Sequence, residues 1–527
     1  MKTWLLTLCW LTLTGSILAT EPAYEFNTPL IPMRAFTGAE LFCKNNSIKK
    51  DVEVEALIRD ARGTVIDHSS FLLAPGQFQS LDLMALGLPR PMPDLRVTLR
   101  YTGGSGGQIS AKVSASNPGR RYSYTVPAIN APFEFANTRI SALAWLPDKK
   151  ATLTVFLTNL SDSRIEASLQ ARSGQLLAAQ RKAVLQPGHS RRLRFSNLQP
   201  GAVGLTLEHD GQPGDLIAAG LALDEDSGFS KPVAFSDPNW SQSQRIVVSQ
   251  VLLGELPESI PSSFRDISAF KSFLLLYNTS ETPQRVNLTL ATPQESYDLP
   301  EIALAGNQAV EIPLSGMQSR GLLPEFEQNA FLVGEHSGER GSLIGEVLTV
   351  GAGNDLVLGA PMKTQQGFAF NMTEWRTDGA FNTLLSLFNT TEEDSAVDIA
   401  VTHEGERFIH TLHIEPASQV TVDFRSLIEN AQLISPNSRT LPRDLSRGTF
   451  ELDNHRVNDG LIPHFQVINA DQATCEPGTG EMAYYVSTAF EWIQDPEEEG
   501  GRVMLQNHGL MSNDDTKNVT GSVGHPA

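Results

Sequence analysis

The chain has 527 residues, which is too long for one hydrophobic core and predicts roughly three to five domains. Hydrophobic residues make up 40% and charged residues 19% of the chain, a composition that excludes a wholly disordered polymer. With 40 Lys and Arg against 60 Asp and Glu, the net charge of −20 argues against nucleic acid as a partner.

The N-terminus has the pattern of a secretory signal peptide. Lys2 precedes an apolar run that ends near Ala19 and Thr20. The run is shorter than the roughly 20 residues of a membrane span. We therefore expect residues 1–20 to be cleaved, the product to be secreted or held at the cell surface, and no membrane insertion afterwards; an uncleaved anchor is the alternative.

One strand-like segment recurs four times and ends each time in an asparagine followed by a sequon. The asparagines are Asn45, Asn159, Asn278 and Asn389, at intervals of 114, 119 and 111 residues. The residues two and four positions earlier are apolar in every copy, which predicts a strand with one face in a core. These residues are Cys43 and Leu41, Leu157 and Val155, Leu276 and Leu274, and Leu387 and Leu385.

Each copy continues with an alternating strand, which we expect to form a hairpin with the segment before it. The alternating strands begin at Val52, Ile165, Val286 and Val397. Later in each copy a glycine-bounded turn predicts a second hairpin, because glycine adopts a positive φ without steric cost. A tyrosine or histidine precedes this glycine by five positions, in the pairs Tyr101 and Gly106, His209 and Gly214, His336 and Gly341, and His455 and Gly460.

A large apolar residue lies fourteen positions before each asparagine and is expected to plug the core. These residues are Ile31, Trp145, Phe264 and Trp375. Short alternating strands, frequent turns and about 110 residues per copy predict an all-β protein of four tandem immunoglobulin-like antiparallel β-sandwich modules. The expected modules span residues 27–130, 131–245, 246–370 and 371–495, a disordered acidic and polar tail spans 496–527, and we expect an elongated or gently bent rod.

The asparagine-ended strand, the alternating strand, the Pro-Gly turn and the glycine-bounded hairpin resemble tandem immunoglobulin-like repeats in proteins secreted by bacteria. The resemblance covers most of the chain after the signal peptide and rests on structural motifs. It implies an adhesive or scaffolding role.

Several residues suggest chemistry, but each also has a structural interpretation. Ser105 has the glycine spacing of a hydrolase nucleophile elbow, yet it falls in a strand turn and not before a helix. The recurring histidines occur once per copy, whereas zinc needs three or four ligands at one point. Asp224, Asp226 and Gly228 resemble the start of a calcium loop but lack its closing glutamate.

The recurring asparagines are interpreted as caps of exposed turns that tolerate a left-handed backbone, and these turns remain possible glycosylation sites. Cys43 occupies a core position that is leucine in the other copies, so we expect Cys43 and Cys475 to be unpaired thiols rather than a disulfide. We predict no catalytic residue, cofactor or metal ion.

The leading hypothesis is a non-enzymatic exported structural, scaffold or adhesion protein, with an unknown protein or glycan as partner. One alternative is an array of carbohydrate-binding modules, for which Trp240 and Trp492 are the expected ligand-facing aromatic residues. Another is an extracellular enzyme, or its accessory subunit, with a site between modules.

Overall fold

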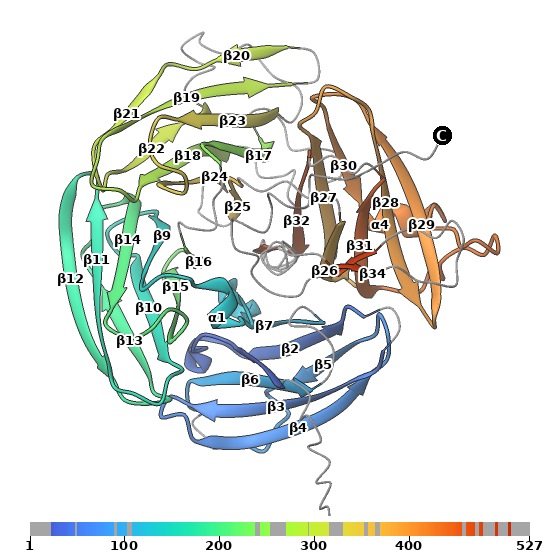
Figure 1. Ribbon diagram of the computed structural model, residues 1–527, viewed down its shortest axis with the longest axis horizontal. Helices are drawn as coiled ribbons and strands as arrows, with labels where there is room; N and C mark the ends of the chain where they lie inside the picture. The colour runs from blue at the N-terminus through green and yellow to red at the C-terminus, as the bar shows by residue number, and fades with distance from the viewer. Residues whose placement is uncertain are drawn as a thin grey trace, which may run out of the picture.

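The computed structural model describes residues 23–47, 50–88, 92–102, 108–237, 243–252, 270–292, 295–315, 330–351, 357–363, 369–455, 460–469, 474–477, 491–493 and 504–506, and all structural statements below concern these residues. The protein is nearly all β, with its strands in antiparallel sheets (Figure 1). The signal peptide, Phe264 and Ser105 lie outside the described residues.

The strands form four successive groups, named here in chain order. The first group holds β1 (Ala23–Asn27), β2 (Gly38–Asn45), β3 (Val52–Asp60), β4 (Val65–Leu73), β5 (Phe78–Asp82), β6 (Leu95–Thr102), β7 (Ile109–Asn117) and β8 (Tyr122–Pro127). The second holds β9 (Arg139–Leu146), β10 (Thr152–Asn159), β11 (Ile165–Ser173), β12 (Leu176–Leu185), β13 (Ser190–Phe195), β14 (Gly201–His209), β15 (Leu216–Asp224) and β16 (Phe229–Ser236).

The third group holds β17 (Arg245–Val251), β18 (Phe270–Asn278), β19 (Gln284–Ala291), β20 (Ser296–Asp298), β21 (Ile302–Leu304), β22 (Ala309–Pro313), β23 (Ala330–His336), β24 (Leu343–Gly351) and β25 (Val357–Pro361). The fourth holds β26 (Ala369–Arg376), β27 (Phe381–Asn389), β28 (Ser395–His403), β29 (Glu406–Ile414), β30 (Gln419–Asp423), β31 (Arg447–Asn454), β32 (Leu461–Asn469) and β33 (Thr474–Pro477). The other elements are η1 (Met33–Ala35), η2 (Pro118–Arg120), α1 (Ala131–Glu134), α4 (Phe424–Glu429), β34 (Glu491–Ile493) and β35 (Met504–Gln506).

Every group pairs its strands in the same order. One sheet, called sheet A here, has the order β1-β6-β3-β4 in the first group, and sheet B has the order β5-β2-β7-β8. The other groups repeat both orders; β20 and β21 share one position in the third group, and β9 pairs with β16 to join the two sheets of the second. The common pairing explains why one sequence pattern recurs along the chain.

The apolar stripe predicted from the sequence is confirmed. All eight of its residues are buried, and each group has its own large hydrophobic cluster in which they lie. Ile31 and Trp375 are also fully buried, as expected of core plugs.

Both predicted hairpins are wrong. The strand that ends at the recurring asparagine lies in sheet B, whereas the alternating strand after it lies in sheet A, as with β2 and β3. The glycine-bounded turn likewise joins sheet A to sheet B, as between β14 and β15. An alternating pattern fits a neighbour in the same sheet and a strand across the core equally well, so it does not distinguish the two.

The recurring asparagine holds the crossing between the sheets. Nδ2 of Asn159 donates to the carbonyl oxygens of Ser163, Leu185 and Gln186 at 2.7, 3.3 and 3.2 Å, and its Oδ1 accepts from the N–H of Ser161 at 2.9 Å. Asn45 and Asn389 also donate to three carbonyls, and Asn278 to two. Each amide therefore ties its own strand end to two other segments.

The four asparagines are at most 1% exposed, so the prediction of exposed caps is wrong. Their amide nitrogens are already used inside the fold, and the folded chain does not offer them for glycosylation. The left-handed residue lies instead in the turn before the fifth strand, with φ of 68° at Gly76, 70° at Gly188, 55° at Asn307 and 48° at Ala417.

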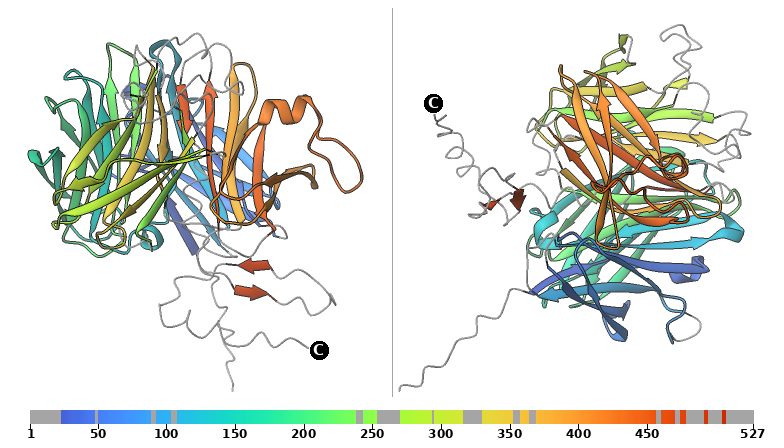
Figure 2. Two further views of the ribbon diagram at one scale, coloured as in Figure 1. Left: turned by 90° about the horizontal axis from the view of Figure 1, so that it is seen from above. Right: turned by 90° about the vertical axis from the view of Figure 1, so that its right-hand side faces the viewer.

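The four groups form a closed ring and not the predicted rod (Figures 1 and 2). Sheet B of each group faces sheet A of the group before it, and sheet B of the first group faces sheet A of the fourth. The last strands of the groups, β8, β16, β25 and β33, contact one another in a cycle. A head-to-tail contact repeated with a constant rotation closes in this way when the rotation fits the number of copies.

We expect Asn389→Ala to lower the local free energy of unfolding of the fourth group by about 2–4 kcal/mol, because three buried carbonyls lose their donor. Hydrogen exchange of peptides from β27 and β28 measures this loss locally. Asn430→Ala, at an exposed residue of the same group, is the matched control. Equal protection in the two variants would contradict a structural role for the buried amide.

Candidate functional site

Three of the four seams between groups are packed with aromatic and aliphatic side chains. Phe156 of the second group lies against Tyr124 of the first, with ring centroids 5.9 Å apart. Tyr277 of the third group reaches over Gly204 and bonds Thr206 of the second at 2.6 Å. Phe331 and Phe388 meet at 3.8 Å between the third and fourth groups.

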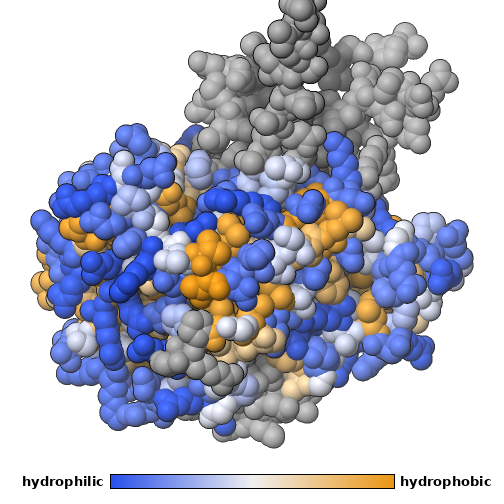
Figure 3. Space-filling model, turned by 90° about the horizontal axis from the view of Figure 1, so that it is seen from below, coloured by the Kyte–Doolittle hydropathy of each residue, from blue (hydrophilic) through white to orange (hydrophobic). Residues whose placement is uncertain are grey.

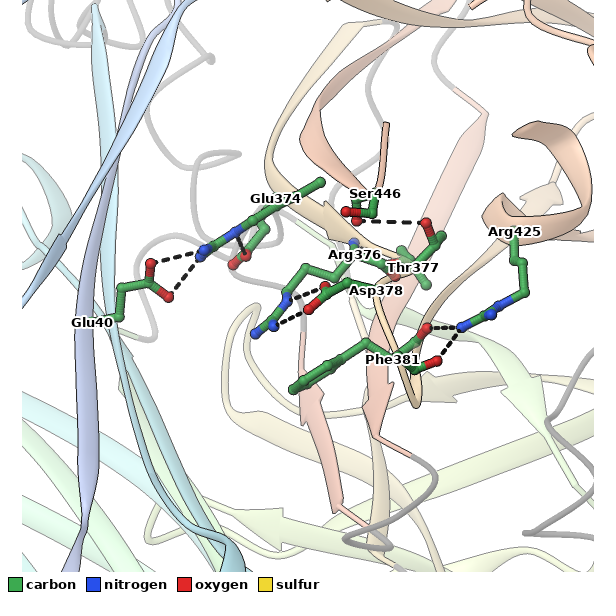
Figure 4. Close-up of polar contacts among 11 residues, drawn as sticks. Glu40, Glu374, Arg376, Thr377, Asp378, Phe381, Arg425 and Ser446 are labelled. Atoms are coloured by element: carbon green, nitrogen blue, oxygen red, sulfur yellow. Dashed lines mark hydrogen bonds and ion pairs between the residues drawn. The ribbon is translucent and has the colours of Figure 1, made fainter. Parts of the chain in front are cut away.

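The fourth seam, which closes the ring, holds a larger network of charges (Figure 4), whereas single ion pairs cross the first and second seams, Arg192 with Asp94 and Lys231 with Glu346. Arg447 on β31 donates from both terminal nitrogens to the carboxylate of Glu40 on β2, at 2.8 Å each. Its Nε donates to Glu374 on β26 at 2.6 Å, and the other oxygen of Glu374 lies 2.8 Å from Nζ of Lys112 on β7. The network joins the first and last groups of the chain.

This network is largely removed from water. The side chains of Lys112 and Glu374 are 1% and 4% exposed, and Lys44, also 1% exposed, lies 3.7 Å from Glu451. The ring of Phe42 lies between the cations, 5.2 Å from the Arg447 guanidinium carbon. A buried ion pair of this kind specifies which faces meet more than it adds to net stability.

The pKa values at the seam follow from burial and pairing. Burial alone raises the pKa of Glu40, but the hydrogen bonds and charge of Arg447 outweigh it and leave that pKa below its ordinary value. Burial by itself lowers the pKa of Arg447, but the carboxylates of Glu40 and Glu374 raise it by more, so the pKa lies above its ordinary value. For Lys44 burial dominates, and its pKa lies below the ordinary value.

The alternation of β2 explains the position of these charges. Leu41 and Cys43 face the core of the first group, so Glu40, Phe42 and Lys44 face outward to the seam. The residues at the position of Glu40 in the other copies are uncharged: Thr154, Phe273 and Leu384. This departure from the repeat is the signal in the sequence that could have located the seam.

A cleft of about 1070 Å³ opens at the seam between the second and third groups. Trp145 on β9 and Phe273 on β18 line it, with ring centroids 5.9 Å apart. The indole nitrogen of Trp145 donates to Glu311 on β22 at 2.7 Å, and Leu176, 76% exposed, stands at the margin. The cleft therefore combines aromatic walls with a carboxylate.

Trp145 departs from its predicted role as a core plug. It is 6% exposed, but the core of the second group is filled from the other face of β9 by Ile140, Ala142 and Ala144. Trp145 points toward the third group, because a residue one position away on a strand faces the opposite side.

The two expected ligand-facing aromatic residues cannot be placed in a site. Trp240 lies outside the described residues. Trp492 belongs to β34, which pairs with β35, but its side chain lies outside the described part of the chain.

The recurring histidines lie apart, one in each group, and have different surroundings. Burial lowers the pKa of His209 and of His336, whereas His455 lies 2.7 Å from a carboxylate oxygen of Asp398. Tyr101, the equivalent in the first group, is 2% exposed. Within the described ranges, no three His, Cys, Asp or Glu side chains gather closely enough to hold a metal ion.

The acidic turn at residues 224–228 is occupied by internal contacts. Asp224 accepts from the N–H of Asp226 at 3.1 Å and from the hydroxyl of Ser227 at 2.5 Å. Asp226 pairs with Lys150 at 2.8 Å. Asp224 therefore stabilises the turn itself, and Asp226 links it to the turn between β9 and β10.

Cys43 is an unpaired thiol in the core, as predicted, and burial raises its pKa above the ordinary value. A thiol with a raised pKa is a poor nucleophile, so Cys43 acts as a small apolar residue. The side chain of Cys475 lies outside the described residues.

Comparison with protein-family models and with curated protein sequences gives no match. None of the helices in the described ranges has the length and apolar character needed to cross a membrane.

We expect Glu374→Gln to destabilise the closing seam by about 3–5 kcal/mol, because it leaves the buried ammonium of Lys112 without a counter-charge. Hydrogen exchange of peptides from β2, β7 and β26 measures the effect. Adding Lys112→Met to this variant should restore part of the protection, since the unpaired charge is then gone.

Glu392→Gln, at an exposed carboxylate of the fourth group, is the control and should leave the seam unchanged. We also expect acidic pH to destabilise the closing seam, as Glu374→Gln does. Because the pKa of Glu40 is lowered in the folded state, its stabilisation is complete above the ordinary value of 4.5 and is lost as pH falls through the folded value. Equal protection in the Glu374→Gln and Glu392→Gln variants would show that the ion network does not hold the seam.

Proposed function

We propose that the chain consists of a signal peptide followed by four sandwich modules that are immunoglobulin-like in size and two-sheet architecture. The common strand order and the presence of one large hydrophobic cluster centred in each group support this division. The strand order itself differs from that of an immunoglobulin constant domain, in which the first strand shares a sheet with the second.

The function that we infer is that of a non-enzymatic exported scaffold or adhesion protein of the cell surface or extracellular space. The observation that carries it is the closure of the ring. Each group is packed on both sides by its neighbours, so loops at the two ends of the sheets are held in fixed relative positions (Figure 2). A rigid platform of this kind suits the presentation of binding surfaces to an extracellular protein or glycan.

We expect the producing cell to export the chain with residues 1–20 removed. Fractionation of the cells, followed by mass spectrometry of the mature N-terminus, tests the location and the cleavage together. A protein that stays in the cytoplasm with Met1 or Lys2 at its start would overturn the export proposal.

A second candidate function, carbohydrate binding, is favoured by the cleft at Trp145. Aromatic faces pack against the C–H faces of sugar rings, and a carboxylate such as Glu311 accepts hydrogen bonds from hydroxyl groups. In this interpretation the chain binds a glycan itself or serves as an accessory subunit that delivers an extracellular enzyme to one.

A glycan array with the mature protein tests this candidate. If the cleft binds the glycan, Phe273→Ala should weaken binding by about tenfold or more, whereas Trp240→Ala and Trp492→Ala should have no effect. Loss of binding in one of the last two variants alone would move the site to the residues first expected from the sequence.

A further inference from the structure

The outer side of the second group carries a concentration of positive charge that contrasts with the rest of the chain. Residues 164–195 contain a single acid, Glu166, in a protein with a net charge of −20. The same stretch contains seven cations: Arg164, Arg172, Arg181, Lys182, Arg191, Arg192 and Arg194. A local surplus of this size creates a positive field on an otherwise acidic protein.

Six of these cations are exposed, and Arg172 is half-buried. Arg164 pairs with Glu166, and Arg192 pairs with Asp94 of the first group. Among the described residues, no carboxylate forms an ion pair with the remaining rim cations of β12 and β13, which are Arg181, Lys182, Arg191 and Arg194. The Arg181 guanidinium lies over the ring of Phe195, 5.6 Å from its centroid, and the side chains of Lys182, Arg191 and Arg194 are exposed to solvent.

The same rim has an open sheet edge. β12 is the outermost strand of sheet A in the second group and pairs only with β11 in the described chain (Figure 1). It also carries three exposed large apolar side chains, Leu176 at 76%, Leu177 at 48% and Val184 at 39%. An open edge with exposed apolar residues is a surface on which another strand can pair.

The outermost strand of sheet A in each of the other three groups lacks one of the features of the β12 edge. In the fourth group, the edge of β29 is bonded by Ile434, at 2.9 and 3.1 Å to the backbone of Ile409. In the third group the position is divided between the three-residue strands β20 and β21. In the first group β4 is open, but Glu53, Glu55 and Asp67 make its surroundings acidic.

The space-filling view, coloured by hydropathy, shows apolar residues among hydrophilic ones on the face of the molecule that contains β4 (Figure 3). Val65 and Leu72 are the large apolar residues of β4 that are more than a third exposed. The edges of β4 and β12 are thus similar in apolar exposure and opposite in charge, so charge decides which partner each one accepts.

We propose that the β12 edge is a docking surface for an extended acidic segment of a partner protein, which adds to sheet A as a further strand. The partner's backbone bonds the open N–H and C=O groups of β12, and its carboxylates face Lys182 and the neighbouring arginines. Main-chain bonds supply affinity in such strand addition, and side-chain charge selects the partner. The surface does not depend on the proposed export, and it adjoins the cleft at Trp145 through Leu176, which lies at the margin of both.

The test uses the full mature protein and a fluorescent ten-residue peptide in which glutamate alternates with valine. Fluorescence anisotropy should show saturable binding that weakens with added salt. Lys182→Glu should weaken it by about tenfold or more, whereas Lys149→Glu, the same change at an exposed turn of the second group, should alter it by less than about twofold.

A second peptide separates strand addition from simple charge attraction. N-methylation of alternate residues blocks backbone pairing along one edge of the peptide and leaves its charge intact, and both registers of methylation are tested. Loss of binding with one register supports strand addition. Unchanged binding with both registers, tighter binding of dextran sulfate than of the peptide, or self-association of the protein that Lys182→Glu abolishes would each overturn the proposal.

Discussion

The buried amide of the recurring asparagine is the contact on which the repeated fold depends. It fixes the end of the second strand of each group, the start of the crossing to the third, and the turn before the fifth. A shorter or apolar side chain at this position leaves two or three carbonyls without a donor inside the protein, where water cannot replace it. The same three segments meet in every copy because the same amide joins them.

The seams show a division of roles that the repeat alone does not require. Aromatic packing such as that of Phe156 or Phe388 tolerates small shifts between groups, because dispersion contacts have no strict direction. The bidentate pair of Arg447 with Glu40 has a fixed geometry, and the burial of Lys112 and Glu374 penalises any other partner. The charged seam therefore defines the register in which the chain closes.

The sequence was sufficient for the strands and their buried faces. Val155 and Leu157 lie two positions apart, as do their counterparts in every copy, and the period of two places them on one face of the strand. It was not sufficient for the connections, since an alternating strand such as the one from Val52 fits a hairpin and a crossing alike. The ring was missed for a related reason: Glu40 and Arg447 are 407 positions apart, and their pairing depends on a rotation summed over four seams.

The cleft at Trp145 was hidden by the same ambiguity. Both Trp145 and Trp375 lie fourteen positions before the recurring asparagine, so both were predicted to face the core. A bulge in the pairing of β26 turns Trp375 into the core, whereas Trp145 faces the next group. The basic rim was missed because net charge was considered for the whole chain. A count over residues 164–195 alone shows the local excess of Arg and Lys.

The closing seam differs from the other three in that no peptide connection spans it. The first and fourth groups are nevertheless tethered to each other through the rest of the ring, so their faces meet at an effective concentration far above that of separate molecules. A modest ionic contact is then enough to keep one chain closed. In a molecule opened at this point, sheet B of the first group and sheet A of the fourth would be free to join those of other chains, which converts a ring into a head-to-tail polymer.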